Sequence, residues 1–233
     1  MRQKKYLLLF FYFYFCTLSF GQNKHFTIGY KDYGLSFGNS INNNGIRINL
    51  FDRNVDKVNG LNISGISKSE ISNGLNFGII WNENTICNGI ILNGLLGESM
   101  TANGIILSGL GYGASKINGI GIGGLALVGD TLNGLFLSPI GISYWNDEVI
   151  KVINGLTIGL IIGASTEKLN GVSISLFNNW IGEQNGATIG LINRAKKLHG
   201  FQLGLWNVAN NNRIFKYMPI INFGFRSEIE KEE

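Results

Sequence analysis

Histidine, cysteine and proline are scarce in this chain, whose 233 residues include only two of each. Cys16 lies in an apolar N-terminal run that we expect to be removed, which leaves Cys87 as the only cysteine. A single cysteine excludes an intrachain disulfide and a cysteine-based metal cluster. Cys87 falls within a series of repeats, where an isolated cysteine is most often a small buried hydrophobic side chain.

Common catalytic and metal-binding patterns are also missing. The sequence has no H-x-x-x-H, G-x-S-x-G, P-loop or EF-hand spacing. His25 lies just after the N-terminal run, and His199 takes the place of a turn asparagine, so neither is a good catalytic candidate. We interpret the scattered acidic residues as a solvated edge rather than a cation site. We therefore expect a protein that is not an enzyme, with no catalytic residue, no cofactor and no metal.

The N-terminus has the pattern of a secretory signal peptide over residues 1–21. Three basic residues precede an apolar run over residues 6–18, and Ser19 and Gly21 supply small residues before a cut ahead of Gln22. Thirteen apolar residues are too few for a helix to span about 30 Å of hydrocarbon. A lipoprotein cut at Cys16 is the alternative, but the bulky Phe15 stands where a small residue is needed.

Removal of this segment also removes most of the excess positive charge. The whole chain has 19 basic and 15 acidic residues. Loss of Arg2, Lys4 and Lys5 leaves 16 against 15, a net charge of +1. No basic stripe remains that would indicate a nucleic-acid partner.

Glycine is abundant, with 33 residues, and it argues against a helical protein because it costs about 1 kcal/mol relative to alanine in a helix. An Asn-Gly pair, His-Gly in the last copy, recurs eleven times with a period near 15 residues. The copies begin at residues 44, 59, 73, 88, 103, 118, 133, 154, 170, 185 and 199. The one step of 21 residues contains Tyr144 and Trp145 and is interpreted as a loop insertion.

Each copy has the same pattern when its positions are numbered from the asparagine. Positions three and five are always apolar, position four varies, position six is small, and position eight is again apolar. We expect positions three and five to form the buried face of a strand. The small residue at position six predicts a tight corner, after which position eight points back into the core.

A corner in every copy predicts an all-β fold, a repeat β-solenoid of about eleven coils of about 15 residues. Equivalent asparagines would then lie about 4.8 Å apart and form a ladder of side-chain amides. The alternative is an outer-membrane antiparallel β-barrel, in which each repeat is one strand and one turn. It is disfavoured because its strands need about 9–11 residues and the apolar alternation here is shorter.

One repeat contains an apparent cofactor motif. Gly119, Gly121 and Gly124 spell G-x-G-x-x-G, the dinucleotide-binding fingerprint. They occupy the second, fourth and seventh positions of a repeat, and no helical pattern follows them. The required context of a strand followed by a helix is therefore missing, and we expect no dinucleotide site.

The repeats define the expected organisation of the chain. A signal peptide at 1–21 is followed by an N-terminal strand or cap at 22–43 and the repeat domain at 44–212. Residues 213–233 form a C-terminal cap strand and a charged tail.

The C-terminal copies and the segment after them resemble a family of bacterial surface-repeat proteins first recognised in spirochaetes. The residues that carry this resemblance are "NGATIGLINRAKKLHGFQLGLWNVANNN" followed by "MPIINFGF". The family is marked by NG-L-x-IGLIN-type repeats, and the match is strong over residues 154–225 and looser over residues 44–132. The resemblance implies a surface or envelope location and supplies no catalytic residues, because the family's function is unassigned.

The fourth positions of the middle copies suggest an interaction surface. In this interpretation position four points outward, and it changes from polar to apolar in four successive copies, at Ile91, Ile106, Gly121 and Phe136. A segment that folds over this stripe is the alternative. We expect an exported, non-enzymatic structural or binding module of the cell envelope, at the outer membrane or the cell surface. Its partner is unknown; the outer membrane, another envelope protein and self-association are candidates. A small outer-membrane β-barrel channel is the alternative function.

Overall fold

The computed structural model describes residues 25–142 and 150–225. The predicted signal peptide, the insertion around Tyr144 and Trp145 and the charged tail after residue 225 lie outside these residues. The chain divides into two compact units, Met1–Ser99 and Met100–Glu233, and strand β5 (Leu96–Ser108) contains the division.

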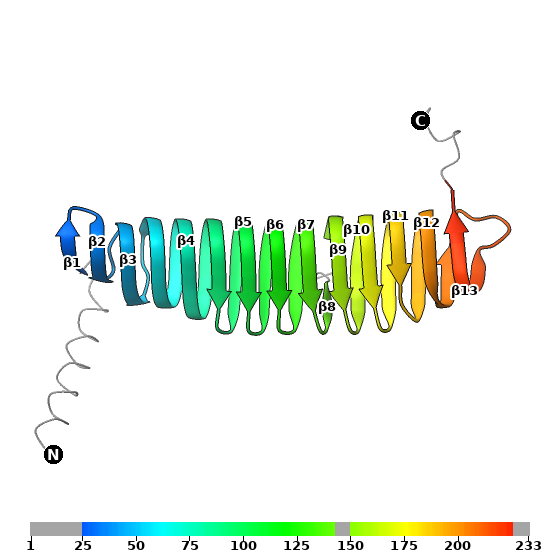
Figure 1. Cartoon of the computed structure of the whole chain (residues 1–233), viewed down its shortest axis with the longest axis horizontal. Coiled ribbons are helices and arrows are strands. Elements are labelled where there is room, and N and C mark those ends of the chain that lie inside the picture. Colours follow the sequence, from blue (N-terminus) through cyan, green and yellow to red (C-terminus); the bar gives the residue numbers. More distant parts are fainter. Residues whose placement is uncertain (1–24, 143–149, 226–233) are drawn as a thin grey trace, which may run out of the picture. The chain divides into compact units, whose positions relative to one another are not determined.

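The first unit begins with a hairpin and continues as parallel coils. Strands β1 (His25–Tyr30) and β2 (Tyr33–Gly38) pair antiparallel, whereas β3 (Asn42–Phe51) pairs parallel with β2 and with β4 (Val55–Asn93). The β3–β4 register joins Asn44 to Asn59, an offset of one repeat. Because β4 runs for 39 residues, it winds through more than two repeats as one continuous ribbon (Figure 1).

The second unit repeats the same parallel arrangement and ends in an antiparallel strand. Its asparagines pair in register from Asn118 to Asn133, from Asn133 to Asn154 and from Asn154 to Asn170. At its end, Phe201 of β12 pairs with Phe223 of the antiparallel β13. Besides the remainder of β5, its strands are β6 (Gly111–Gly123), β7 (Ala126–Ser138), β8 (Gly141–Ile142), β9 (Ile150–Gly159), β10 (Ile162–Ser175), β11 (Asn178–Ile189), β12 (Ile192–Ala209) and β13 (Tyr217–Gly224).

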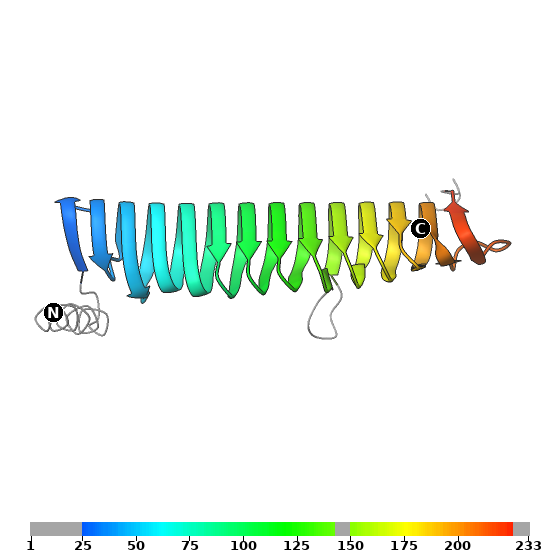
Figure 2. The same cartoon turned by 60° about the horizontal axis from the view of Figure 1, so that its bottom comes forward.

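Parallel, in-register stacking of coils of about 15 residues makes each unit a β-solenoid. In Figures 1 and 2, successive coils of a unit stand side by side with their strands running in the same direction. The 21-residue step is absorbed without loss of register, because β9 pairs with both β7 and β10. The predicted all-β solenoid is therefore confirmed.

The prediction of which side chains face the interior of the coil and which face outward is wrong. Side chains at position four are buried throughout, and Arg47, Ile106 and Gln202 are all 0% exposed. Positions three and five point outward, as at Ile105, which is 40% exposed, and Leu107, which is 39% exposed. Alternation shows that a strand has two faces, but it does not show which face is inside. The sequence pattern predicts that the apolar face is buried, whereas this solenoid encloses many polar side chains.

The turn lies close to its predicted place but orients the following residues differently. Strands end at position six at Ser108, Gly123 and Ser138, and a bend follows. Position six faces inward against the turn, which explains its small side chains. Position eight points outward rather than into the core, and Ile161 is 48% exposed. The glycines at position two, not those at position six, have positive φ, for example 133° at Gly155.

The predicted asparagine ladder is confirmed in both units. In the first unit each side-chain amide donates to the asparagine one repeat earlier, at 2.7 Å from Asn73 Nδ2 to Asn59 Oδ1. In the second unit the distances are 2.7 Å from Asn133 to Asn118 and 2.7 Å from Asn154 to Asn133. The ladder therefore continues across the repeat that carries the insertion.

Hydrogen bonds compensate for the polar interior. In the first unit the buried Arg47 Nη1 lies 2.7 Å from Asp52 Oδ1, and Arg47 also donates to Ser40 and Asn62. Asp52 accepts a further bond from Ser64 Oγ at 2.8 Å. A buried ion pair needs such additional hydrogen bonds to offset the loss of hydration.

The interior of the second unit changes from apolar to polar along the repeats. Ile106, Ile117 and Phe136 make its first coils apolar. Its later coils hold a chain of amides, in which Asn179 Nδ2 donates to Asn193 Oδ1 at 2.8 Å and Asn193 Nδ2 donates to Asn207 Oδ1 at 2.8 Å. Because stacked amides bond to one another, polar side chains are accommodated in this interior.

Candidate functional site

The four residues predicted as an interaction surface are interior residues. Ile91 in the first unit and Ile106 and Phe136 in the second are 0% exposed, and Gly121 is also buried. Phe136 pairs with Gly121, and a Cβ at Gly121 would lie 3.0 Å from the Phe136 ring, so the ring occupies the space that this glycine leaves. Their role is packing, because the predicted outward direction of position four is wrong.

The outward rows of the second unit form an apolar wall instead. Parallel register places equivalent side chains of successive coils next to each other, about 4.8 Å apart. Each therefore covers part of its neighbours while its outer surface stays in contact with solvent. We define the apolar wall as the outward residues at positions three and five: Ile105, Leu107, Ile120, Ile122, Leu135, Leu137, Leu156, Ile158, Val172, Ile174, Ile189, Phe201 and Leu203.

A second apolar row follows the bend of each coil. Its most exposed side chains exceed every side chain of the apolar wall, reaching 57% at Leu176 and 67% at Leu205. We define this apolar edge as the apolar residues at positions seven and eight of the second unit other than Pro139: Leu110, Leu125, Ile140, Leu160, Ile161, Leu176, Phe177, Leu191, Ile192, Leu205 and Trp206.

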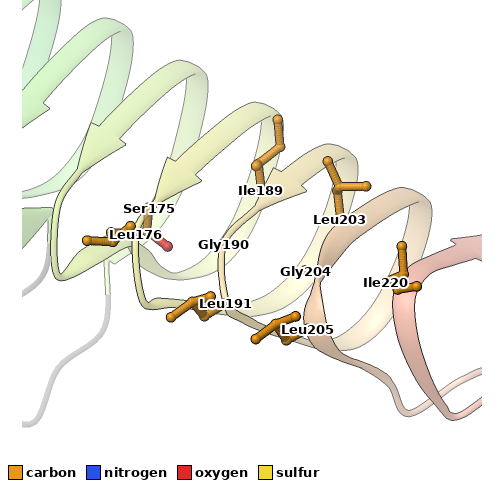
Figure 3. Close-up of a pocket in the computed structure, with 9 residues that line it drawn as sticks. All are labelled: Ser175, Leu176, Ile189, Gly190, Leu191, Leu203, Gly204, Leu205 and Ile220. Atoms are coloured by element: carbon orange, nitrogen blue, oxygen red, sulfur yellow. The ribbon is translucent and has the colours of Figure 1, made fainter.

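A groove of about 390 Å³ runs between the apolar wall and the apolar edge near the C-terminal end of the second unit. Figure 3 shows Ile189 and Leu203 on one side of it and Leu191 and Leu205 on the other. Gly190 and Gly204 lie between these rows, and Leu176, Ser175 and Ile220 complete the lining. The groove exists because position six carries a small residue between two outward apolar rows.

Charged residues are absent from both apolar rows. Among the described residues of the second unit, positions two to eight of the repeats contain no charged residue at all. In the described part of the first unit the same positions contain one, Arg47, which is buried. The first unit also exposes apolar side chains at these positions, including Ile46, Phe51 and Ile90.

The outward side chains between the apolar edge of one repeat and the asparagine of the next are mostly polar or charged. We call them the charged wall; in the second unit they include Met100, Ser115, Thr131, Lys168, Trp180, Glu183 and Arg194. In the second unit Lys168 Nζ lies 3.1 Å from Glu183 Oε1, and Arg194 lies over the Trp180 ring at 5.3 Å from its centroid. A hydrogen bond from Asn185, followed by the interaction with Lys168, lowers the pKa of Glu183. A pocket of about 670 Å³ on this wall is lined by Ser165, Thr166, Glu167, Trp180, Gly182, Glu183, Lys196 and Lys197.

Two of the described residues with reactive side-chain types have structural places. Burial raises the pKa of the Cys87 thiol to about 11, so it is protonated at neutral pH and is a poor nucleophile. His199 pairs with Asn185 in the register of β11 and β12, at the asparagine position of its repeat. Within residues 25–142 and 150–225, no three histidine, cysteine or acidic residues come together in a way that could hold a metal ion.

Comparison of the chain with protein-family models, with curated proteins and with solved structures gives no match. In the part of the chain that the structure describes, no helix is long and apolar enough to cross a membrane. The candidate site is therefore defined by the geometry of the second unit, whose coils carry the apolar wall and edge on one side and the charged wall on the other.

Proposed function

We propose that the protein is an exported, non-enzymatic repeat protein of the cell envelope that binds its partner through the apolar side of the solenoid. One observation carries this proposal: positions two to eight expose apolar side chains in every repeat and carry no exposed charge. Contiguous apolar surface of this extent on a soluble protein is typical of an interaction site. The signal-peptide pattern and the resemblance to surface-repeat proteins support the envelope location.

The size of the apolar wall is sufficient for a stable contact. Covering its thirteen side chains would remove on the order of 800 Å² from water, which is what one partner contributes to a standard interface. Area alone does not set the affinity, because association costs about 4–15 kcal/mol in lost freedom and the strength of the contact depends on how well the partner fits the wall.

The proposal is tested by adding charge to the apolar wall. Leu107→Lys with Ile122→Lys changes two outward side chains, so we expect a folded protein that is lost from the envelope fraction. Ser115→Lys with Thr131→Lys adds the same charge to the charged wall and is the control. Equal envelope retention of both variants would argue against binding through the apolar wall.

The export part of the proposal has its own test. The envelope form of the protein should begin at Gln22, which N-terminal sequencing would establish. A cytoplasmic protein that retains Met1 would contradict it.

A further inference from the structure

We infer that the partner of the apolar edge and groove of the second unit is a lipid bilayer that contains anionic lipid, with the edge inserted among the acyl chains. This inference rests on the proposed function, because it names the partner of the same apolar surface. Its evidence is the shape of that surface, the pairing of its backbone and the charge beside it.

The apolar surface turns a corner. The apolar wall lies on one side of the groove and the apolar edge on the other (Figure 3), and the edge carries the more exposed side chains. A second copy that packed sheet against sheet would lie about 10 Å away and cover only the wall. The edge, including Leu160 and Leu205, would stay in water. The fluid acyl chains of a bilayer can contact the apolar wall and the apolar edge at the same time.

The backbone of the apolar edge is already hydrogen-bonded. Each coil bonds to the one before it at the bend: Leu176 N donates to Leu160 O at 3.0 Å, and Leu191 N donates to Leu176 O at 3.2 Å. Trp206 N donates to Leu191 O at 2.9 Å. Insertion into hydrocarbon requires that backbone N–H and C=O groups find partners within the protein, because lipid tails offer none. These bonds satisfy the backbone N–H groups of Leu176, Leu191 and Trp206.

The groove has the form of an acyl-chain site. Aliphatic side chains line both sides, and Gly190 and Gly204 leave room between them. It crosses three successive coils, a length of roughly 10 Å between the first and the last. No charged side chain lines it.

In the described coils of the second unit, basic side chains outnumber acidic ones. Its described residues include eight basic side chains, namely Lys116, Lys151, Lys168, Arg194, Lys196, Lys197, Arg213 and Lys216. They include three acidic ones, Asp130, Glu167 and Glu183, whereas the whole unit, Met100–Glu233, has ten basic and nine acidic residues. Arg194 follows the edge residue Ile192 by two positions, which brings a cation next to the inserted row. Apolar and basic groups side by side are the usual combination for binding at an anionic membrane interface.

Vesicle flotation tests the inference. The chain from residue 22, which contains every described residue, is mixed with phosphatidylcholine vesicles with and without phosphatidylglycerol. We expect it to float with the anionic vesicles and to bind the neutral ones more weakly. Leu176→Ser with Leu205→Ser should weaken binding about tenfold or more without unfolding, since both side chains are mostly exposed.

The matched control changes one equally exposed side chain of the charged wall. Met100→Ser removes a side chain that is 63% exposed and is compared with Leu205→Ser, at 67%; we expect it to keep at least most of the flotation. Brominated lipid gives a second readout: quenching of tryptophan fluorescence should fall in Trp206→Phe. Equal loss of flotation in the edge variant and the charged-wall control, or no loss in the edge variant, would overturn the inference.

Sedimentation separates this inference from the function on which it rests. A protein that does not float but forms a dimer, which the wall variant Leu107→Lys with Ile122→Lys dissociates, would show that a second copy is the partner. The lipid inference would then be wrong and the binding function would stand. A monomer that does not float and whose envelope location is unaffected by charge on the apolar wall would overturn both.

Discussion

Replacement of Phe136 by alanine should strongly destabilise the second unit, because its ring is fully buried at position four. Truncation of a buried phenylalanine to alanine costs about 3–5 kcal/mol. We expect the upper part of this range, since the neighbouring Gly121 has no side chain that could move into the cavity. Leu137→Ala removes an outward, partly exposed side chain of the same strand and should cost about 1–2 kcal/mol.

Urea unfolding of the two variants measures this difference. The Gly121→Val change added to Phe136→Ala should recover part of the lost stability, because it returns volume to the same cavity. That rescue would distinguish packing from a general effect on folding. Equal urea midpoints for Phe136→Ala and Leu137→Ala would refute the assignment of position four to the interior.

Three further perturbations have expected outcomes. Gly159→Val should abolish or severely reduce folding measured by thermal melts, because its Cβ would overlap the Ile162 carbonyl oxygen at the bend; an unchanged melting temperature would contradict this. Arg47→Ala leaves Asp52 as a buried charge without its ion-pair partner and should cost about 3–5 kcal/mol in urea unfolding, whereas a cost below about 1 kcal/mol would count against the buried pair. Cys87 should resist alkylation at pH 8 in the folded protein and react readily in denaturant, because burial raises its pKa to about 11.

The sequence was sufficient to predict the solenoid but not which side chains face its interior. The spacing of the Asn-Gly pairs is a property of the chain alone, so period, parallel stacking and the asparagine ladder could be read from it. The direction of each row depends on tertiary structure. The sequence predicts apolar positions three and five as core because burial of apolar surface is the usual rule, whereas many apolar atoms remain on protein surfaces.

A polar signal for the correct orientation is present in the sequence. Arg47 stands at position four, and Asp52 follows five residues later, where the coil brings the two together across the interior. Asn62 and Asn76 occupy the same position in the next two repeats, and Asn62 Nδ2 donates to Asn76 Oδ1 at 2.9 Å. Stacked polar residues that satisfy one another are compatible with an interior. The apolar wall, edge and groove could not be predicted without this orientation.

Cysteine labelling across one strand tests the central claim, that the apolar rows face outward and position four faces inward. In the chain from residue 22 with Cys87→Ser, single cysteines are placed at Ile105, Ile106 and Leu107, which are 40%, 0% and 39% exposed. The account predicts rapid alkylation of Ile105→Cys and Leu107→Cys and protection of Ile106→Cys until denaturant is added. Rapid labelling at Ile106→Cys with protection on both sides of it would contradict the account.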